Sequence, residues 1–174
     1  MRTSYLSFLI PIIAVWSLAP SGAHAQQTED TQPANSSGAI VADITLTKTS
    51  DLNFGDVIAG GTSGTVVLSA AASPTRSVTG GTQLGNAIGV TSATFTVGGE
   101  GASTYSITLP SSDVTITSGA NSMIVNTFTS SPSGTGILSG GLQTLYVGAT
   151  LSVDASQAAG DDYTGSFNVT VAYD

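Results

Sequence analysis

The clearest hydrophobic pattern lies in residues 163–173, where apolar and polar side chains alternate. One parity holds Tyr163, Gly165, Phe167, Val169, Val171 and Tyr173. The other parity holds Thr164, Ser166, Asn168, Thr170 and Ala172. Because an extended backbone sends successive side chains to opposite faces, the pattern predicts a long β-strand with one face in the core. We expect this strand to be paired along its whole length, since an open apolar edge would bind other chains.

Residues 39–48 form a second alternating segment, in which Ile40, Ala42, Ile44 and Leu46 occupy every second position. The preceding residues 26–38 are polar and show no period, which predicts a flexible arm. The alternating segment is either the first strand of its own domain or a strand donated to a neighbouring copy, because an extended peptide can add to an open sheet edge. The hydrophobic period is the same in both cases, so both interpretations stay open.

Between these segments, short β-like runs follow one another with glycine-rich connections. Three pairs of neighbouring runs predict hairpins: residues 52–58 with 65–70, 93–97 with 104–109, and 114–117 with 122–129. The longer run 142–153 carries Gly148 in its middle, which predicts a bulge or a close crossing of backbones. No window after residue 25 shows a sustained helical period. We therefore expect an all-β fold, an antiparallel β-sandwich in a single domain over residues 39–174.

The first 25 residues have the order of a secretory signal peptide. Arg2 precedes an apolar run over residues 6–18, and Ala23-His24-Ala25 provides a small-x-small cleavage site. The apolar run is too short to span a bilayer, and no later stretch approaches the roughly 20 apolar residues that a spanning helix needs. We expect an exported protein that begins at Gln26 and has no transmembrane segment.

The charge balance disfavours nucleic acids and anionic membranes as partners. The chain carries three basic and eleven acidic residues, a net charge of −8. Loss of Arg2 with the signal peptide leaves Lys48 and Arg76 against all eleven acids, a net charge of −9. A surface of this sign repels phosphate groups, so we expect no nucleic-acid partner.

The residue types on which most enzymes rely are missing from the expected mature chain. The chain has no cysteine, and its only histidine, His24, lies in the signal peptide. Lys48, the only lysine, falls in an alternating segment, where a solvent-exposed side chain is the expected role. Asp154, Asp161 and Asp162 lack the spacing of known calcium loops, which favours a solvated acidic turn over a weak calcium site. We expect no enzyme activity, no catalytic or cofactor-binding residues and no metal site.

Several motifs together resemble a family of exported bacterial domains. They are Leu52-x-Phe54-Gly55, Ala93-x-Phe95-x-Val97, Tyr105-x-Ile107-x-Leu109-Pro110, Leu145-Tyr-Val-Gly148-Ala-Thr-Leu151-x-Val153, and Gln157-x-x-Gly160 followed by the alternating residues 163–173. As a set they are similar to the family catalogued as domain of unknown function 4402, from Ala42 onward. The turn from Gly160 to Tyr163 is one residue longer than the glycine-x-tyrosine turn usual in that family.

The last residues are also similar to subunits of chaperone–usher fimbriae and to spore-coat-U-like domains, with Tyr173 in penultimate position and Gly160 upstream. This resemblance implies an immunoglobulin-like or pilin-like sandwich that takes a strand from a neighbour, with identical subunits and a periplasmic chaperone and usher as partners. We expect a non-enzymatic structural protein, a subunit of a fimbrium, surface filament or coat, in the periplasm, at the cell surface or outside the cell. The alternative is a self-contained monomeric binding module of the adhesin type.

Overall fold

The structure, a computed structural model, describes residues 29–160 and 162–174. The chain divides into two compact units, residues 1–38 and 39–174. Residues 29–38 of the first unit form neither helix nor strand. The predicted signal peptide, the start of the predicted arm at residues 26–28, and Asp161 lie outside the described residues. The described part of the chain contains no helix with the length and apolarity that a membrane crossing needs.

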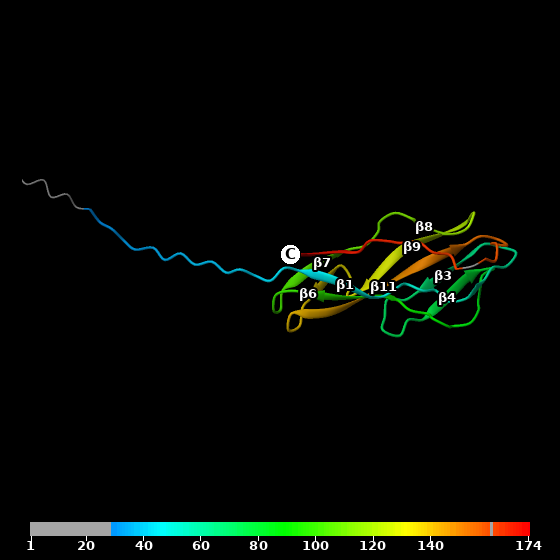
Figure 1. The fold of residues 1–174 in the computed structure, drawn as a ribbon, viewed down its shortest axis with the longest axis horizontal. Coiled ribbons are helices and arrows are strands. Elements are labelled where there is room, and N and C mark those ends of the chain that lie inside the picture. Colours follow the sequence, from blue (N-terminus) through cyan, green and yellow to red (C-terminus); the bar gives the residue numbers. More distant parts are fainter. Residues whose placement is uncertain (1–28, 161) are drawn as a thin grey trace, which may run out of the picture. The chain divides into compact units, whose positions relative to one another are not determined.

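The described residues form twelve strands, all in the second unit (Figure 1). They are β1 (Thr45–Ser50), β2 (Val57–Ile58), β3 (Gly64–Leu68), β4 (Arg76–Gly80), β5 (Gln83–Leu84), β6 (Ala93–Gly98), β7 (Thr104–Thr108), β8 (Val114–Ser118), β9 (Asn121–Ser131), β10 (Thr135–Ile137), β11 (Leu142–Val153) and β12 (Thr170–Tyr173). Every pairing between them is antiparallel. The described residues contain no helix, in agreement with the absence of a helical period in the sequence.

Strand β11 is the centre of the largest sheet. Its residues 142–147 pair with β6, and its residues 149–153 pair with β3. Along its other side, residues 146–152 pair with β9. The sheet then continues to β1 beyond β6, to β4 beyond β3 and to β8 beyond β9.

A second layer, the three-stranded sheet β10-β7-β12, packs against the large sheet. One core cluster joins the two layers, because Tyr105 of β7 is buried together with Phe95 and Val97 of β6 and Leu145 and Val147 of β11. Burial of one such side chain stabilises the fold by about 1.5–3 kcal/mol. The predicted all-β antiparallel sandwich is thereby confirmed.

Arg76 of β4 holds two loops over a second core cluster, which includes Phe54. Its Nη1 donates hydrogen bonds to the carbonyl oxygens of Phe54 and Asp56, at 2.8 and 2.9 Å. Its Nη2 donates to the carbonyl oxygens of Gly85 and Asn86, both at 3.2 Å. The planar guanidinium presents several donors in a fixed fork, so one side chain can bind four carbonyl groups. Arg76 therefore positions the short β2–β5 ribbon, a role that its charge alone did not indicate.

Gly148 lies where two backbones come close, as predicted. The register between β11 and β9 shifts between Gly148 and Thr150, which is a β-bulge. A Cβ atom at Gly148 would collide with the carbonyl oxygen of Leu68 and the main-chain nitrogen of Ala70. The close approach is therefore confirmed at Gly148, whereas the extra residue of the bulge lies in β9, opposite Ala149.

Of the three predicted hairpins, only the third is confirmed. Strands β8 and β9 pair with each other across the turn at residues 119–120. The first predicted hairpin is wrong, because β2 pairs with β5 whereas β3 pairs with β4 and β11. The second is wrong because residues 99–103 carry the chain from β6 in the large sheet to β7 in the small one. Alternation fixes which face of a strand is buried, but it does not fix which strand lies beside it.

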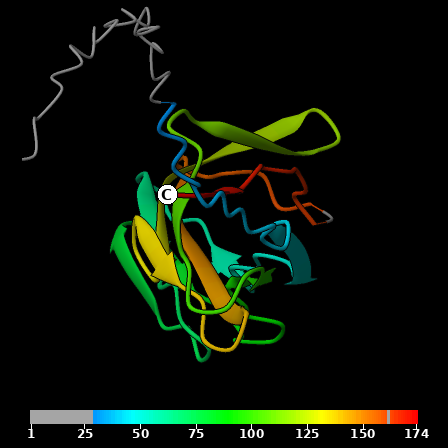
Figure 2. The ribbon, with the colours of Figure 1, turned by 90° about the vertical axis from the view of Figure 1, so that its left-hand side faces the viewer.

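The last segment is a regular strand only over β12, where it pairs with β7. Thr164 forms an isolated bridge with Thr117 of β8, and Figure 2 shows the red C-terminal segment beside the yellow-green β8–β9 hairpin. The main chain of residues 165–169 forms no hydrogen bond with the main chain of any other described residue. The prediction of pairing along all of residues 163–173 is therefore wrong. Thr170 lies six residues after Thr164, but their partners, Thr108 and Thr117, lie nine residues apart. The partner side therefore has extra residues, and residues 109–113 loop out of the ladder.

The predicted inward face of this segment is nevertheless the face that packs. Phe167, Val169, Val171 and Tyr173 are half-buried against the cluster between the two layers, and Tyr163 is half-buried as well. Gly165 is exposed. None of the six is fully buried, because the segment lies at the edge of the small sheet. The deeply buried strand of the fold is β11.

Tyr105 is the largest fully buried side chain of the described core. Its hydroxyl donates to Oε1 of Gln143 at 2.7 Å, and the same oxygen accepts from the main-chain nitrogen of Ile137 at 3.0 Å. Burial raises the pKa of Tyr105 above its ordinary value, because the phenolate would lose its hydration.

Replacement of Gly148 by alanine is expected to lower the free energy of unfolding by about 1–3 kcal/mol, the usual cost of forcing extra atoms into a packed site. Urea denaturation followed by circular dichroism measures this change. Gly61→Ala is the matched control, because a Cβ atom at Gly61 meets nothing within 4 Å. Equal unfolding midpoints for the two variants would contradict the close approach at Gly148.

The free energy of unfolding is expected to fall as the pH rises above about 10. A folded pKa above the unfolded value means that Tyr105 contributes its full stabilisation below the unfolded pKa and loses it as the pH passes the folded pKa. Urea denaturation across this pH range, with Tyr105→Phe for comparison, isolates the effect. The variant should lose less stability at alkaline pH than the native chain, and an identical loss in both would contradict the assignment.

Candidate functional site

Strand β1 is an edge strand that pairs with one neighbour among the described strands, β6. The pairing runs from Thr45 opposite Gly98 to Ser50 opposite Thr94, with a shift in register between Lys48 and Ser50. Its one apolar side chain, Leu46, is half-buried against the cluster between the layers. An edge strand of this kind is bound by hydrogen bonds on one side only, and its other side is a template for pairing.

The structure divides the four residues of the predicted first or donor strand into two groups. Ile44 and Leu46 are half-buried and contact the core. Ile40 is 102% exposed, and Ala42 is exposed as well. The strand therefore begins at Thr45, well after the predicted start at residue 39, and residues 39–43 are exposed.

Three residues form a hydrogen-bonded latch at the beginning of β1, which we call the Ala42 latch: Ala42, Glu100 and Tyr173. The Tyr173 hydroxyl donates to the carbonyl oxygen of Ala42 at 2.9 Å and accepts from the main-chain nitrogen of Glu100 at 2.7 Å. The Glu100 carboxylate accepts from the main-chain nitrogen of Ala42 at 3.3 Å. Both main-chain polar groups of Ala42 are thus bound by residues far away in the sequence.

Sequence reasoning assigned Tyr173 to packing and missed its hydroxyl. A signal for the second role was present, because the hydroxyl of a partly buried tyrosine usually finds a hydrogen-bond partner. Gly99 makes room for the ring, since a Cβ atom there would collide with the Tyr173 hydroxyl. Beside the latch lies an open hollow of about 480 Å³, lined by Val41, residues 102–104, Tyr173 and Asp174.

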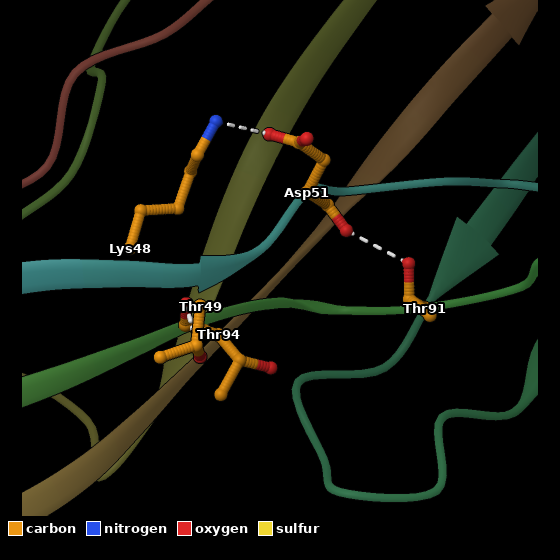
Figure 3. A network of polar contacts seen from close by, with 5 residues as sticks. All are labelled: Lys48, Thr49, Asp51, Thr91 and Thr94. Atoms are coloured by element: carbon orange, nitrogen blue, oxygen red, sulfur yellow. Dashed lines mark hydrogen bonds and ion pairs between the residues drawn. The ribbon is translucent and has the colours of Figure 1, made fainter.

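A second set of polar contacts holds the end of β1 (Figure 3). Nζ of Lys48 lies 2.5 Å from Oδ1 of Asp51, the one ion pair found among the described residues. The Thr49 hydroxyl donates to the carbonyl oxygen of Thr94 at 3.0 Å, and the Thr91 hydroxyl donates to the carbonyl oxygen of Asp51 at 2.8 Å. Lys48 is exposed, as expected, and an exposed ion pair is worth about 0–1 kcal/mol. Strand β1 is therefore fixed at both ends by contacts that are individually weak.

The predicted acidic turn contributes nothing to this site. Asp154 and Asp162 are exposed, and Asp161 lies outside the described residues. Among the described side chains, no group of three or more histidine, cysteine, aspartate or glutamate residues could hold a metal ion.

Replacement of Tyr173 by phenylalanine removes the hydroxyl and retains the ring. We expect faster amide hydrogen exchange in residues 39–50, with a loss of about 1 kcal/mol in the free energy of unfolding, the usual net worth of a hydrogen bond. Hydrogen exchange read by mass spectrometry measures this change. Tyr163→Phe is the control, because the Tyr163 hydroxyl donates elsewhere, to the carbonyl oxygen of Ala158. Equal exchange in residues 39–50 of both variants would contradict the latch.

Comparison with known proteins identifies the chain at the level of the family. The family model described as Domain of unknown function (DUF4402) matches residues 44–173. Comparison with curated proteins and with solved structures gives no match. The matched span begins just before β1 and ends with the last residue of β12, so it contains every strand described above. The chain therefore belongs to the family described as Domain of unknown function (DUF4402).

Proposed function

We propose that this protein is a non-enzymatic, exported structural subunit that assembles by β-strand pairing, with β1 of one copy placed beside β6 of the next. The observation that carries the proposal is the position of β1, an edge strand held on one side and fixed at its start by the Ala42 latch. A segment of polar chain precedes it, which gives the strand a free end to lead the exchange.

The exchange costs little in contact energy, because a donated β1 makes the same contacts that it makes in its own domain. Ile44 and Leu46 would enter the same half-buried positions, and Ala42 would meet Glu100 and Tyr173 of the accepting copy. Exchange of an identical element is a low-cost route to assembly. Each copy donates one strand and accepts one, so the contact is head-to-tail and produces a filament when the rotation does not close.

The proposed donor differs from the segment predicted from alternation alone. Ile44 and Leu46 are the side chains that would fill the acceptor, whereas Ile40 and Val41 are exposed in the present arrangement and belong to the connecting arm. The donated unit in this proposal is residues 42–50, from the latch to the end of β1.

Partners and location follow from the same proposal. A copy whose β1 has left exposes one edge of β6 and the apolar side chains beneath it, which a periplasmic chaperone would need to cover until assembly. The proposal also includes an usher as an assembly partner, and it places the protein in a fimbrium, surface filament or coat. The immunoglobulin-like or pilin-like subtype of the sandwich, and the likeness to fimbrial and spore-coat-U-like proteins, stay predictions.

The alternative function is a self-contained monomeric binding module of the adhesin type. One observation favours it: β1 pairs with β6 of its own domain in the structure described here. Under this alternative the latch keeps β1 closed and has no role in assembly.

The two functions are separated by cysteine pairs across β1 and β6. Thr47 lies directly opposite Thr96, and the chain has no cysteine of its own. We expect a mixture of the single variants Thr47→Cys and Thr96→Cys, at high protein concentration in a glutathione buffer, to form a disulfide-linked heterodimer. The double variant should form ladders on a non-reducing gel. Thr115→Cys, on the distant strand β8, replaces Thr96→Cys as the control.

Assembly through β1 is contradicted if the Thr47–Thr96 mixture gives no more heterodimer than the control mixture. In that case the double variant should form an intramolecular disulfide, which would establish the monomeric alternative.

A further inference from the structure

Two interruptions of regular pairing border one cavity at the surface of the sandwich. The first is the bulge in β9, where residues 127 and 128 stand opposite the single residue Ala149. The second is the loop of residues 109–113 between β7 and β8. Bulges often lie beside binding sites, because they redirect a side chain without ending the sheet.

The bulge in β9 is maintained against a backbone cost. Thr127 has a φ of 49°, in the left-handed region that β-branched residues avoid. A residue held there costs on the order of 1–3 kcal/mol and persists only where its surroundings enforce it. The Thr127 hydroxyl donates a hydrogen bond to Oδ1 of Asn126 at 3.2 Å. This contact holds the two neighbouring side chains together at the bulge.

The consequence of the bulge is the position of Phe128. Its ring lies against that of Phe167, with 4.8 Å between the ring centroids and 43° between the planes. Phe128 is half-buried and also contacts both core clusters. Phe128 also lines the cavity, whose exposed surface is mainly polar.

The cavity is an open hollow of about 340 Å³, lined by residues 110–113 and 126–128, all of which are exposed or half-buried. We propose that it binds one ring of an uncharged saccharide. Ligand pockets in proteins are commonly about 300–1,000 Å³, so this cavity is at the small end and suits a single sugar ring. This site is independent of β1 and does not rest on the proposed assembly.

The chemistry of the lining selects a neutral polyhydroxylated ligand. The hydroxyls of Ser111 and Ser112, the amide of Asn126 and the carboxylate of Asp113 offer both donors and acceptors over a small area. Asp113 is the one charged residue in the lining, and its carboxylate would accept a strong, charge-assisted hydrogen bond from a sugar hydroxyl. An anionic ligand is disfavoured by this carboxylate and by the net charge of −8.

The test is an NMR titration of the mature chain, residues 26–174, labelled with ¹⁵N. The probes are the methyl glycosides of glucose, galactose, mannose and N-acetylglucosamine, with galacturonate as the anionic probe and N-acetylalanine methylamide as the peptide probe. We expect at least one neutral glycoside to shift the amide signals of residues 110–113 and 126–128, with millimolar affinity. Asp113→Asn should weaken this binding about tenfold, the effect of losing a charge-assisted hydrogen bond.

Asp154→Asn is the matched control, because Asp154 is an exposed carboxylate outside the cavity, and it should leave the affinity unchanged. Asp113 is exposed, so both variants are expected to fold, and their amide spectra report this directly. The proposal is overturned if no neutral glycoside shifts these signals, if galacturonate or the peptide probe binds more tightly, or if Asp113→Asn and Asp154→Asn behave alike.

Discussion

The double-sided pairing of β11 is the constraint on which the rest of this fold depends. One strand of the large sheet serves as the partner of β6 and β3 on one side and of β9 on the other. Its buried side chains belong to both core clusters, Leu145 and Val147 to one and Leu151 and Val153 to the other. The chain has no cysteine for a disulfide, and the described residues contain a single ion pair. Burial of apolar side chains around β11 is therefore the main interaction that holds the two core clusters together.

A fixed central strand leaves both ends of the domain at the edges of the sheets. Strand β1 closes one edge of the large sheet and β12 closes one edge of the small sheet. The Ala42 latch joins these two edges, because its tyrosine belongs to β12 and its alanine precedes β1. Each edge strand is bound on one side only and contributes less than a central strand. The proposed exchange of β1 uses this difference, since β1 can leave its place without disturbing β11.

Much of the fold could be predicted from local patterns, whereas the pairing partners could not, with the exception of the β8–β9 hairpin. Alternation identified the inward residues of the last segment, and the position of Gly148 in a long apolar run identified the close approach to Leu68. Pairing is a non-local property, so the predicted hairpin between β6 and β7 failed when residues 99–103 crossed between layers. The latch could be predicted only in part, because the hydroxyl of a partly buried tyrosine usually finds a partner, but nothing in the sequence marks the main chain of Ala42 as that partner. The loop at residues 109–113 could not be predicted either, because it follows from the pairing of Thr164 with Thr117 and of Thr170 with Thr108, which are distant in the sequence.

The functional account depends on whether β1 stays in its own domain when copies meet. The most direct measurement is the mass of a chain of residues 26–174, by sedimentation over a wide range of protein concentration, beside a chain that begins at residue 49. Our account predicts a series of larger species that grows with concentration for the longer chain and is absent for the shorter one. A folded monomer of residues 26–174 at every concentration, without a chaperone, would contradict it.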